Sequence, residues 1–342
     1  MYIIPVERCD DDRYKTGLNI GNHLWFIKLM NDIERTSYLN ILTRFRIVII
    51  PKNTTYSYHS GRFFPGRYEL YNVILSEIYS IENIKTIYQF KFNITPAYIK
   101  SLCRLGSLNV LQHIERIDKM QPCVVDDYDH HQNSYLAEAC RSGNIELLEW
   151  LKKNNYLTSY NSNGTILVNS CTSGFDTASA RGHVEVLDWL IKNNLPLEYT
   201  HIAMDQASWY GHVNVLEWWL NSGLPLKYTT GINQASWNGH FNVLEWWKTS
   251  GLLLKYNEDA IVVGISENKI KVLEWWKDSG LRLILPDKKR LKSLLSECNE
   301  ETREWWYENF DDFNDFNDFN SFDVNRIIFR INKSIKSFFT KN

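Results

Sequence analysis

Residues 206–219 read QASWYGHVNVLEWW, and residues 234–247 read QASWNGHFNVLEWW. The two stretches begin 28 residues apart and differ only where Tyr210 and Val213 are replaced by Asn238 and Phe241. Near-identity at a fixed interval indicates that the chain builds one structural unit several times, because each copy must pack against its neighbours in the same way.

The period is set by the Leu of the V-L-E-W-W signature. This Leu and its counterparts in looser copies follow one another at spacings of 37, 39, 29, 28 and 29 residues: Leu111, Leu148, Leu187, Leu216, Leu244 and Leu273. Five residues before this Leu, most copies carry a Gly: Gly106, Gly143, Gly182, Gly211 and Gly239. In the last three of these copies a His follows the Gly: His183, His212 and His240. Weaker copies lie around Ile84–Phe90 and at Trp305-Trp306.

Each copy is expected to form two short helices. The first spans about residues 201–209 and ends at Gly211, since glycine tolerates the left-handed conformation that a helix stop needs. The second carries apolar residues at i, i+3 and i+7 on one face: Val213, Leu216 and Leu220. The link over residues 224–228 is short and extended. Two helices and a link, repeated every 28 or 29 residues, indicate a helical solenoid.

The unit resembles an ankyrin repeat. That family has an Ala-rich first helix, a Gly-His turn and an apolar second helix, and Ala207-Ser208, Gly211-His212 and Val215-Leu216 fill those places here. The resemblance covers about residues 67–310 and is clearest over residues 134–285. It implies an all-α, ankyrin-like helical solenoid with short inter-repeat links, and a protein that binds other proteins and has no catalysis of its own.

The copies depart from the family in length. A typical repeat has about 33 residues, and the missing ones fall between the second helix and the next first helix, where ankyrins project a β-hairpin. We therefore expect these fingers to be short or absent. The sequence of the repeat, in a chain rich in Asn, Ile, Lys and Tyr, is similar to the ankyrin repeats of giant viruses of amoebae. That similarity implies a viral protein acting inside a host cell, in its cytoplasm.

In ankyrins, the two residues before the Gly-His turn vary with the partner. Their counterparts here supply a predicted partner-binding surface on the concave face: Arg141, Arg181, Trp209, Tyr210, Trp237, Asn238 and Glu267. Aromatic residues and Arg are enriched in binding hot spots. The alternative, that Trp209 and Trp237 pack between helices, remains open at this point.

No catalytic, cofactor or metal site is expected. The recurring His183, His212 and His240 are too far apart to share one metal ion, whose bonds to nitrogen are about 2 Å long, so we expect them to cap helices. One loop carries a cluster of possible ligands whose spacing matches no known site: Asp126, Asp127, Asp129, His130 and His131. Phosphate-loop, G-x-G-x-x-G, G-x-S-x-G and H-E-x-x-H motifs are absent from the sequence.

Overall composition adds two exclusions. With a net charge of −2, the chain has no overall positive electrostatic field that would attract nucleic acid. Six cysteines without a C-x-x-C pair indicate reduced thiols and no disulfide frame or zinc site.

The two ends lie outside the repeat. Residues 1–66 are expected to cap the array, with a strand at Ile47–Ile50 and short helices at Leu24–Met30 and Tyr38–Leu42. Residues 311–342 hold the run DDFNDFNDFN and then a basic amphipathic helix over residues 324–339. Such a helix either caps the array or lies on an anionic membrane, and we favour the cap.

The sequence thus predicts a non-enzymatic protein–protein interaction scaffold that binds a partner protein, from a host cell, on its concave face. The alternative functions use the terminal regions, as a membrane-surface attachment or as an F-box-like adaptor for a host ubiquitin ligase.

Overall fold

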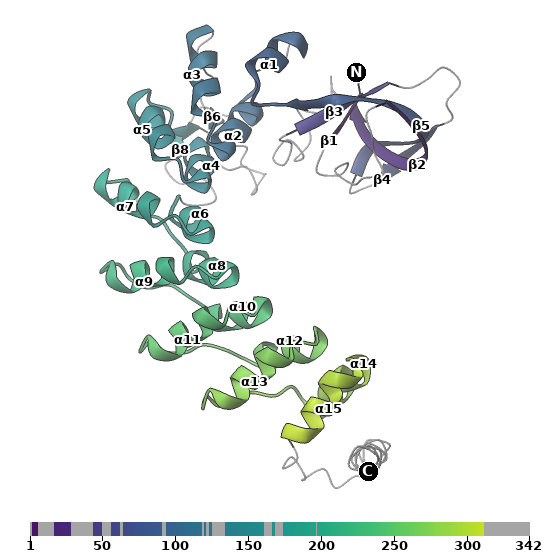
Figure 1. Ribbon diagram of the computed structural model, residues 1–342. Helices are drawn as coiled ribbons and strands as arrows, with labels where there is room; N and C mark the ends of the chain where they lie inside the picture. Colours follow the sequence, from purple (N-terminus) through teal and green to yellow (C-terminus); the bar gives the residue numbers. More distant parts are fainter. Residues whose placement is uncertain are drawn as a thin grey trace, which may run out of the picture. The chain divides into compact units, whose positions relative to one another are not determined.

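A computed structural model describes the backbone of residues 2–5, 17–28, 44–49, 56–61, 64–90, 94–117, 120, 123–124, 134–160, 166–167, 174–195 and 197–310, and most side chains of these ranges from residue 79 onward. The chain divides into two compact units, Met1–Thr200 and His201–Asn342. Figure 1 labels their helices and strands.

The first unit opens with an antiparallel sheet. Its strands are β1 (Tyr2–Pro5), β2 (Gly17–Lys28), β3 (Arg44–Ile49), β4 (Tyr56–Gly61) and β5 (Phe64–Ser80). They lie in the order β2-β1-β3-β5-β4, and β2 also pairs with β5. Four of the strands therefore form a closed ring of pairings, which leaves fewer unpaired backbone groups than an open sheet does.

The sheet corrects part of the sequence analysis. The strand expected at Ile47–Ile50 is confirmed over Ile47–Ile49, which belong to β3. The helix expected at Leu24–Met30 is wrong over Leu24–Lys28, which belong to β2 and pair with β5 as far as Phe26 and with β1 at Ile27 and Lys28. A short apolar run does not distinguish a strand from a helix, because the deciding hydrogen bonds come from a distant segment. Tyr38–Leu42 lies outside the described residues. The strand β5 runs through residue 66, so non-repeat structure continues to Ser80.

Helices follow the sheet in the first unit. The single helix α1 (Ile84–Phe90) precedes three helix pairs: α2 (Pro96–Leu105) with α3 (Leu108–Ile117), α4 (Tyr135–Ser142) with α5 (Ile145–Lys153), and α6 (Gly174–Arg181) with α7 (Val184–Lys192). First helices pack on first helices, since α4 contacts both α2 and α6.

The second unit contains four more helix pairs. They are α8 (Ile202–Tyr210) with α9 (Val213–Asn221), α10 (Gly231–Asn238) with α11 (Phe241–Thr249), α12 (Asp259–Ser266) with α13 (Ile270–Asp278), and α14 (Lys288–Glu297) with α15 (Glu300–Asn309). The first helices α8, α10, α12 and α14 again contact one another in succession. The predicted all-α solenoid is confirmed for the repeat array.

The repeat signature is explained by burial and by backbone conformation. The six Leu residues that set the period are all buried: Leu111, Leu148, Leu187, Leu216, Leu244 and Leu273. The Gly before each second helix has a positive φ, as Gly211 does at 83°. In the copy without this Gly, Asn268 occupies the same place at 54°, and Asn is one of the few side chains that tolerate this region.

Links between 28- and 29-residue copies are short. In the second unit no strand interrupts residues 222–230 or 250–258, which are described in full. This agrees with the expected loss of the fingers. The two longer copies differ, because β6 (Cys123–Val124), β7 (Ser159–Tyr160) and β8 (Ile166–Leu167) form a small three-stranded sheet.

The paired tryptophans hold successive repeats together. The second ring of each pair is buried. In two pairs its indole N–H reaches the first helix of the preceding repeat: Trp247 Nε1 donates to Ser208 Oγ at 3.0 Å, and Trp276 Nε1 to Ser236 Oγ at 2.9 Å. The first ring of these two pairs reaches the preceding second helix, as Trp246 Nε1 does by donating to Glu217 Oε1 at 2.7 Å. These two pairs therefore tie their repeats to both helices of the preceding repeat.

Candidate functional site

The two tryptophans of the predicted surface lie outside the core. Trp209 and Trp237 come from the C-terminal ends of α8 and α10, and their rings stack with centroids 6.2 Å apart and planes inclined by 22°. Trp237 is 42% exposed, and Trp209 is partly exposed. The rings therefore lie at the surface and also pack against each other across two adjacent first helices, so their role in binding a partner stays a prediction.

Other predicted residues surround this stack in the second unit. Tyr210 is 46% exposed at the end of α8, Asn238 is exposed at the end of α10, and Glu267 is exposed at the C-cap of α12. The Lys269 ammonium donates to the backbone carbonyl of Trp237, which ties the end of α10 to the following repeat.

The two predicted arginines belong to the first unit. Arg181 is exposed at the last position of α6, and Arg141 is partly exposed near the end of α4. Arg141 Nε lies 3.3 Å from Glu138 Oε2. Because the two units are separate bodies, the predicted residues form two groups, a basic one on the first unit and an aromatic one on the second.

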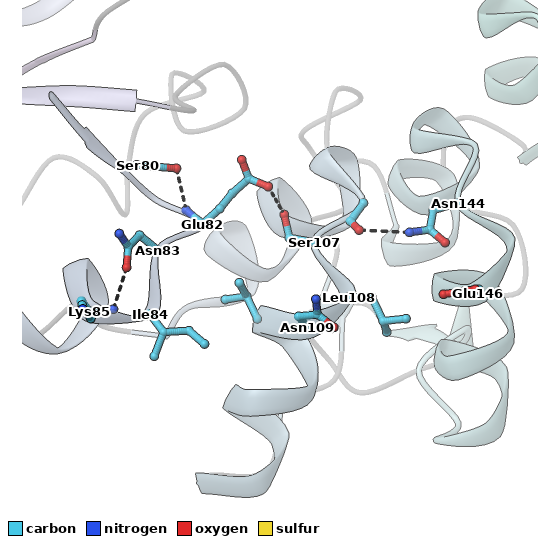
Figure 2. A pocket seen from close by; sticks show the side chains of 12 residues that line it. Ser80, Glu82, Asn83, Ile84, Lys85, Ser107, Leu108, Asn109, Asn144 and Glu146 are labelled. Carbon is cyan, nitrogen blue, oxygen red and sulfur yellow. Dashed lines mark hydrogen bonds between the residues drawn. The ribbon is translucent and has the colours of Figure 1, made fainter.

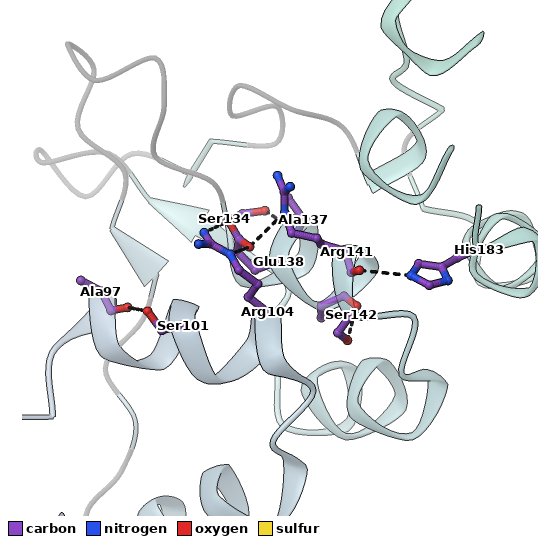
Figure 3. Close-up of polar contacts among 10 residues, drawn as sticks. Ala97, Ser101, Arg104, Ser134, Ala137, Glu138, Arg141, Ser142 and His183 are labelled. Atoms are coloured by element: carbon purple, nitrogen blue, oxygen red, sulfur yellow. Dashed lines mark hydrogen bonds and ion pairs between the residues drawn. The ribbon is translucent and has the colours of Figure 1, made fainter. Parts of the chain in front are cut away.

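An ion pair that the sequence analysis missed anchors the basic group. Arg104 Nε and Nη2 donate to the two carboxylate oxygens of Glu138 at 2.6 and 2.7 Å, and Glu138 is only 1% exposed (Figure 3). A sequence signal for Arg104 exists, since it stands two residues before Gly106 as Arg141 stands two before Gly143. Nothing in the sequence pattern indicates which carboxylate would join them.

The recurring histidines do more than begin helices. His183, His212 and His240 occupy the N-cap positions of α7, α9 and α11, as expected, but none makes a side-chain capping hydrogen bond. His183 Nε2 instead donates to the backbone carbonyl of Arg141 at 3.1 Å (Figure 3). At His183 the expected capping role is therefore replaced by a bridge to the turn of the preceding repeat.

A separate pocket lies in the first unit beside the N-termini of α1, α3 and α5 (Figure 2), with a volume of about 840 Å³. Its polar groups bond to one another: Ser107 Oγ donates to a carboxylate oxygen of Glu82, and Asn144 Nδ2 donates to the Gly106 carbonyl at 3.1 Å. These groups are therefore engaged in holding adjacent turns together.

The described residues contain neither a metal-ligand cluster nor a membrane-spanning helix. Within the described ranges, no group of three or more His, Cys, Asp or Glu side chains could hold a metal ion. The loop ligands from Asp126 to His131 lie outside those ranges, as does the amphipathic segment 324–339. No helix among the described residues is long and apolar enough to cross a membrane.

No protein-family model matches the chain, and no curated protein matches it. Among solved structures, the crystal structure of the human ASB11 ankyrin repeat domain is similar, with 14% sequence identity over 59% of this chain and 92% of that one and a TM-score of 0.41. The stacking of successive helix pairs and the positive-φ turns between their helices make the repeat array an all-α helical solenoid.

Proposed function

We propose that the chain is a non-enzymatic protein-interaction scaffold, and that it binds a partner protein on the exposed ends of its first helices in the second unit. The observation that supports this is the surface stack of Trp209 and Trp237 with Tyr210 beside it. Large aromatic rings provide the contact area and rigidity from which binding hot spots are built.

The fold does not require rings at these places. The position of Trp209 and Trp237 is occupied by Arg141 in one copy and by Ser266 in another, and those copies keep the same two helices and turn. The Trp209 and Trp237 rings are large, stacked at the surface and not required by the fold. These properties favour a role in binding a partner. A partner from a host cell, and a location in its cytoplasm, stay predictions from the sequence.

The experiment is affinity capture from lysate of the cells that naturally contain the protein. The baits are the full chain, the Trp209→Ala/Trp237→Ala variant, and a Leu253→Ala control. Leu253 is 76% exposed in the same unit but lies in a link between repeats. Truncating hot-spot residues costs about 2 kcal/mol or more, so we expect the double variant to lose the partner and the control to retain it.

Thermal unfolding followed by circular dichroism accompanies the capture. Loss of the partner by a double variant that melts like the wild type supports the proposal. Equal recovery by all three baits would place binding elsewhere and contradict it. A double variant that melts well below the wild type would show that the stack is structural.

A further inference from the structure

Two adjacent first helices of the second unit carry the same pair of surface side chains, a Gln followed three residues later by a Trp. They are Gln206 with Trp209 on α8 and Gln234 with Trp237 on α10. Residues three apart are neighbours on a helix surface, and all four are partly or fully exposed. Because α8 and α10 pack against each other (Figure 1), the two pairs form one surface, which we call the amide–ring patch.

The patch is two repeats long. At the equivalent places, the first helices α6 and α12 carry Thr177 with Ala180 and Val263 with Ser266. These helices form without an amide or a ring there, so the fold does not require the Gln–Trp pair. Its presence in two successive repeats favours a ligand that contacts both in the same way.

The patch is uncharged, and its amides are available to a ligand. Asp205 is the one charged residue of α8 and α10, which are both described in full, and it is buried and accepts hydrogen bonds from Thr229. Within the described residues, the side-chain amides of Gln206 and Gln234 make no hydrogen bond. Each amide therefore has two N–H donors available beside a large ring.

A segment in the polyproline II conformation matches these features. Proline-rich segments dock on aromatic side chains, and this conformation has no internal hydrogen bonds, so its backbone carbonyls can accept from Gln N–H groups. It advances about 9 Å per turn of three residues, and packed helices lie about 8–10 Å apart. Successive turns that run along the array would therefore meet successive Gln–Trp pairs with the same face.

We infer that the amide–ring patch binds a proline-rich segment of the partner protein, with one polyproline II turn against α8 and the next against α10. The inference rests on the proposed function, because it names the chemistry of the partner at the same rings. Trp209 and Trp237 stack with centroids 6.2 Å apart, so each ring restricts the other before a ligand arrives. The proline-rich segment is also ordered in advance, and both properties lower the entropy lost on binding.

The probes are fluorescein-labelled peptides of equal length, titrated with the full-length protein by fluorescence anisotropy. The Pro peptide consists of three Pro-Pro-Ala triplets, and the flexible peptide has Gly-Ser-Ala triplets in their place. We expect the Pro peptide to bind with a Kd below about 1 mM. The flexible peptide should bind about tenfold more weakly or worse, since ordering even one more backbone residue opposes binding by about that factor.

Salt provides a second readout. Affinity for the Pro peptide should stay constant as NaCl rises from about 50 to 500 mM, because the contact involves no ion pair that salt could screen.

Variants locate the binding surface. Gln234→Glu keeps the size of the side chain but replaces its N–H donors with acceptors, so affinity for the Pro peptide should fall about fivefold, as for one lost hydrogen bond. Gln206→Glu should act alike. Gln112→Glu is the matched control, because Gln112 is partly exposed on the second helix α3 of the first unit, and it should leave affinity unchanged. Trp237→Ala should weaken the Pro peptide about thirtyfold or more.

Three outcomes would overturn the inference. The first is no binding of the Pro peptide, or binding no tighter than that of the flexible peptide. The second is an equal effect of Gln234→Glu and Gln112→Glu. The third is at least about tenfold tighter binding of a peptide of Pro-Pro-Lys triplets at low salt, which would assign the rings to a cation instead.

Capture by the Trp209→Ala/Trp237→Ala variant separates this result from the proposed function. If capture depends on the rings but the Pro peptide does not bind, the proposed function stands and only the proline-rich ligand fails. If capture does not depend on the rings, while the Pro peptide binds the wild type and not the double variant, the proposed function fails and the ligand chemistry of the patch stands.

Discussion

At the scale of single residues, neighbouring identical side chains have different tasks. In the pair Trp246-Trp247, both rings are buried, but the first donates to a Glu on the preceding second helix and the second to a Ser on the preceding first helix. The two rings meet edge to face, with centroids 5.0 Å apart, an arrangement that aromatic pairs favour. A doubled tryptophan is thus a way to contact two helices of a neighbour from one helix.

The serine beneath each buried ring should be sensitive to substitution. Ser236 Oγ accepts from Trp276 Nε1 and donates to the Ile232 carbonyl at 3.0 Å, with no exposure of the residue. Ser236→Ala should lower the free energy of unfolding by about 1–3 kcal/mol, because it leaves a buried indole N–H without an acceptor. Urea denaturation measures this. Ser293→Ala, at an exposed site, is the control, and an equal loss in both variants would refute the assigned role.

The glycine turns provide a second comparison. Gly211 and Gly239 both have positive φ, at 83° and 70°. A Cβ at Gly211 would meet His240 Nδ1 at 2.9 Å, whereas a Cβ at Gly239 would meet nothing within 4 Å. Gly239→Ala should therefore cost only the left-handed backbone penalty of about 1–2 kcal/mol, and Gly211→Ala should cost more.

The His240→Ala background tests the cause of this difference. Removing the imidazole should bring the penalty of Gly211→Ala, measured by urea denaturation within that background, close to that of Gly239→Ala. An unchanged penalty would show that the ring is not what limits the space.

At the scale of elements, three first helices, α6, α8 and α10, each hold the link that leads to the next repeat through a buried polar residue. Asp176 in α6 bonds to Thr200, and Asp205 in α8 accepts from the Thr229 backbone N–H at 3.1 Å and from its hydroxyl. In α10 the equivalent Asn233 bonds to Asn257. A buried polar residue on the first helix therefore hydrogen-bonds to backbone and side-chain groups of the link, which have no strand partner. This explains how the links can be short.

This arrangement predicts an ordered pair of effects. Asp205→Ala should lower the free energy of unfolding by about 1–3 kcal/mol, since the link loses the hydrogen bonds that the buried Asp205 carboxylate accepts from Thr229. Asp205→Asn should cost less, because the amide oxygen still accepts, as the Asn at the equivalent place in α10 indicates. Equal losses in urea denaturation would contradict the role assigned to the acceptor.

At the scale of the whole molecule, the chain is two units, and each is built from contacts between successive repeats. Stability in such an array is close to a sum of local terms, so groups buried in different repeats contribute separately. In the first unit, burial raises the pKa of the Cys103 and Cys140 thiols and of the Tyr98 and Tyr135 phenols above their ordinary values.

These shifts predict a loss of stability at high pH. The folded-state pKa values lie above the unfolded ones, so the stability is fully present below the unfolded value and falls as pH rises above it. For a thiol, the loss of stability begins near the unfolded-state pKa of about 8.5. It should reach about 2 kcal/mol per buried thiol by pH 10. Urea denaturation with a reductant at pH 7.5, 9 and 10 measures it.

The Cys140→Ala variant isolates one thiol. Its stability at pH 7.5 will be lower, but its further loss between pH 7.5 and 10 should be smaller than that of the wild type by about 2 kcal/mol. A pH dependence identical to that of the wild type would show that this thiol does not keep its proton in the folded state.

The sequence by itself determined the period, the helix pairs, the glycine stops and the buried Leu of each copy, because these depend on residues a few positions apart: helical hydrogen bonds, a left-handed turn and one apolar face. It also placed Trp209, Trp237, Arg141 and Arg181 at the ends of first helices by register alone.

Only the tertiary structure decided what lies next to what. It assigned Leu24–Lys28 to a strand through pairing with β5 and β1, and it placed the stack of Trp209 and Trp237 at the surface and Trp247 in the core. It also turned His183 onto the preceding turn and joined Arg104 to Glu138. The partners in these contacts are separated along the chain by tens of residues, so no local pattern carries them. Burial and pairing are properties of the neighbours that folding brings together.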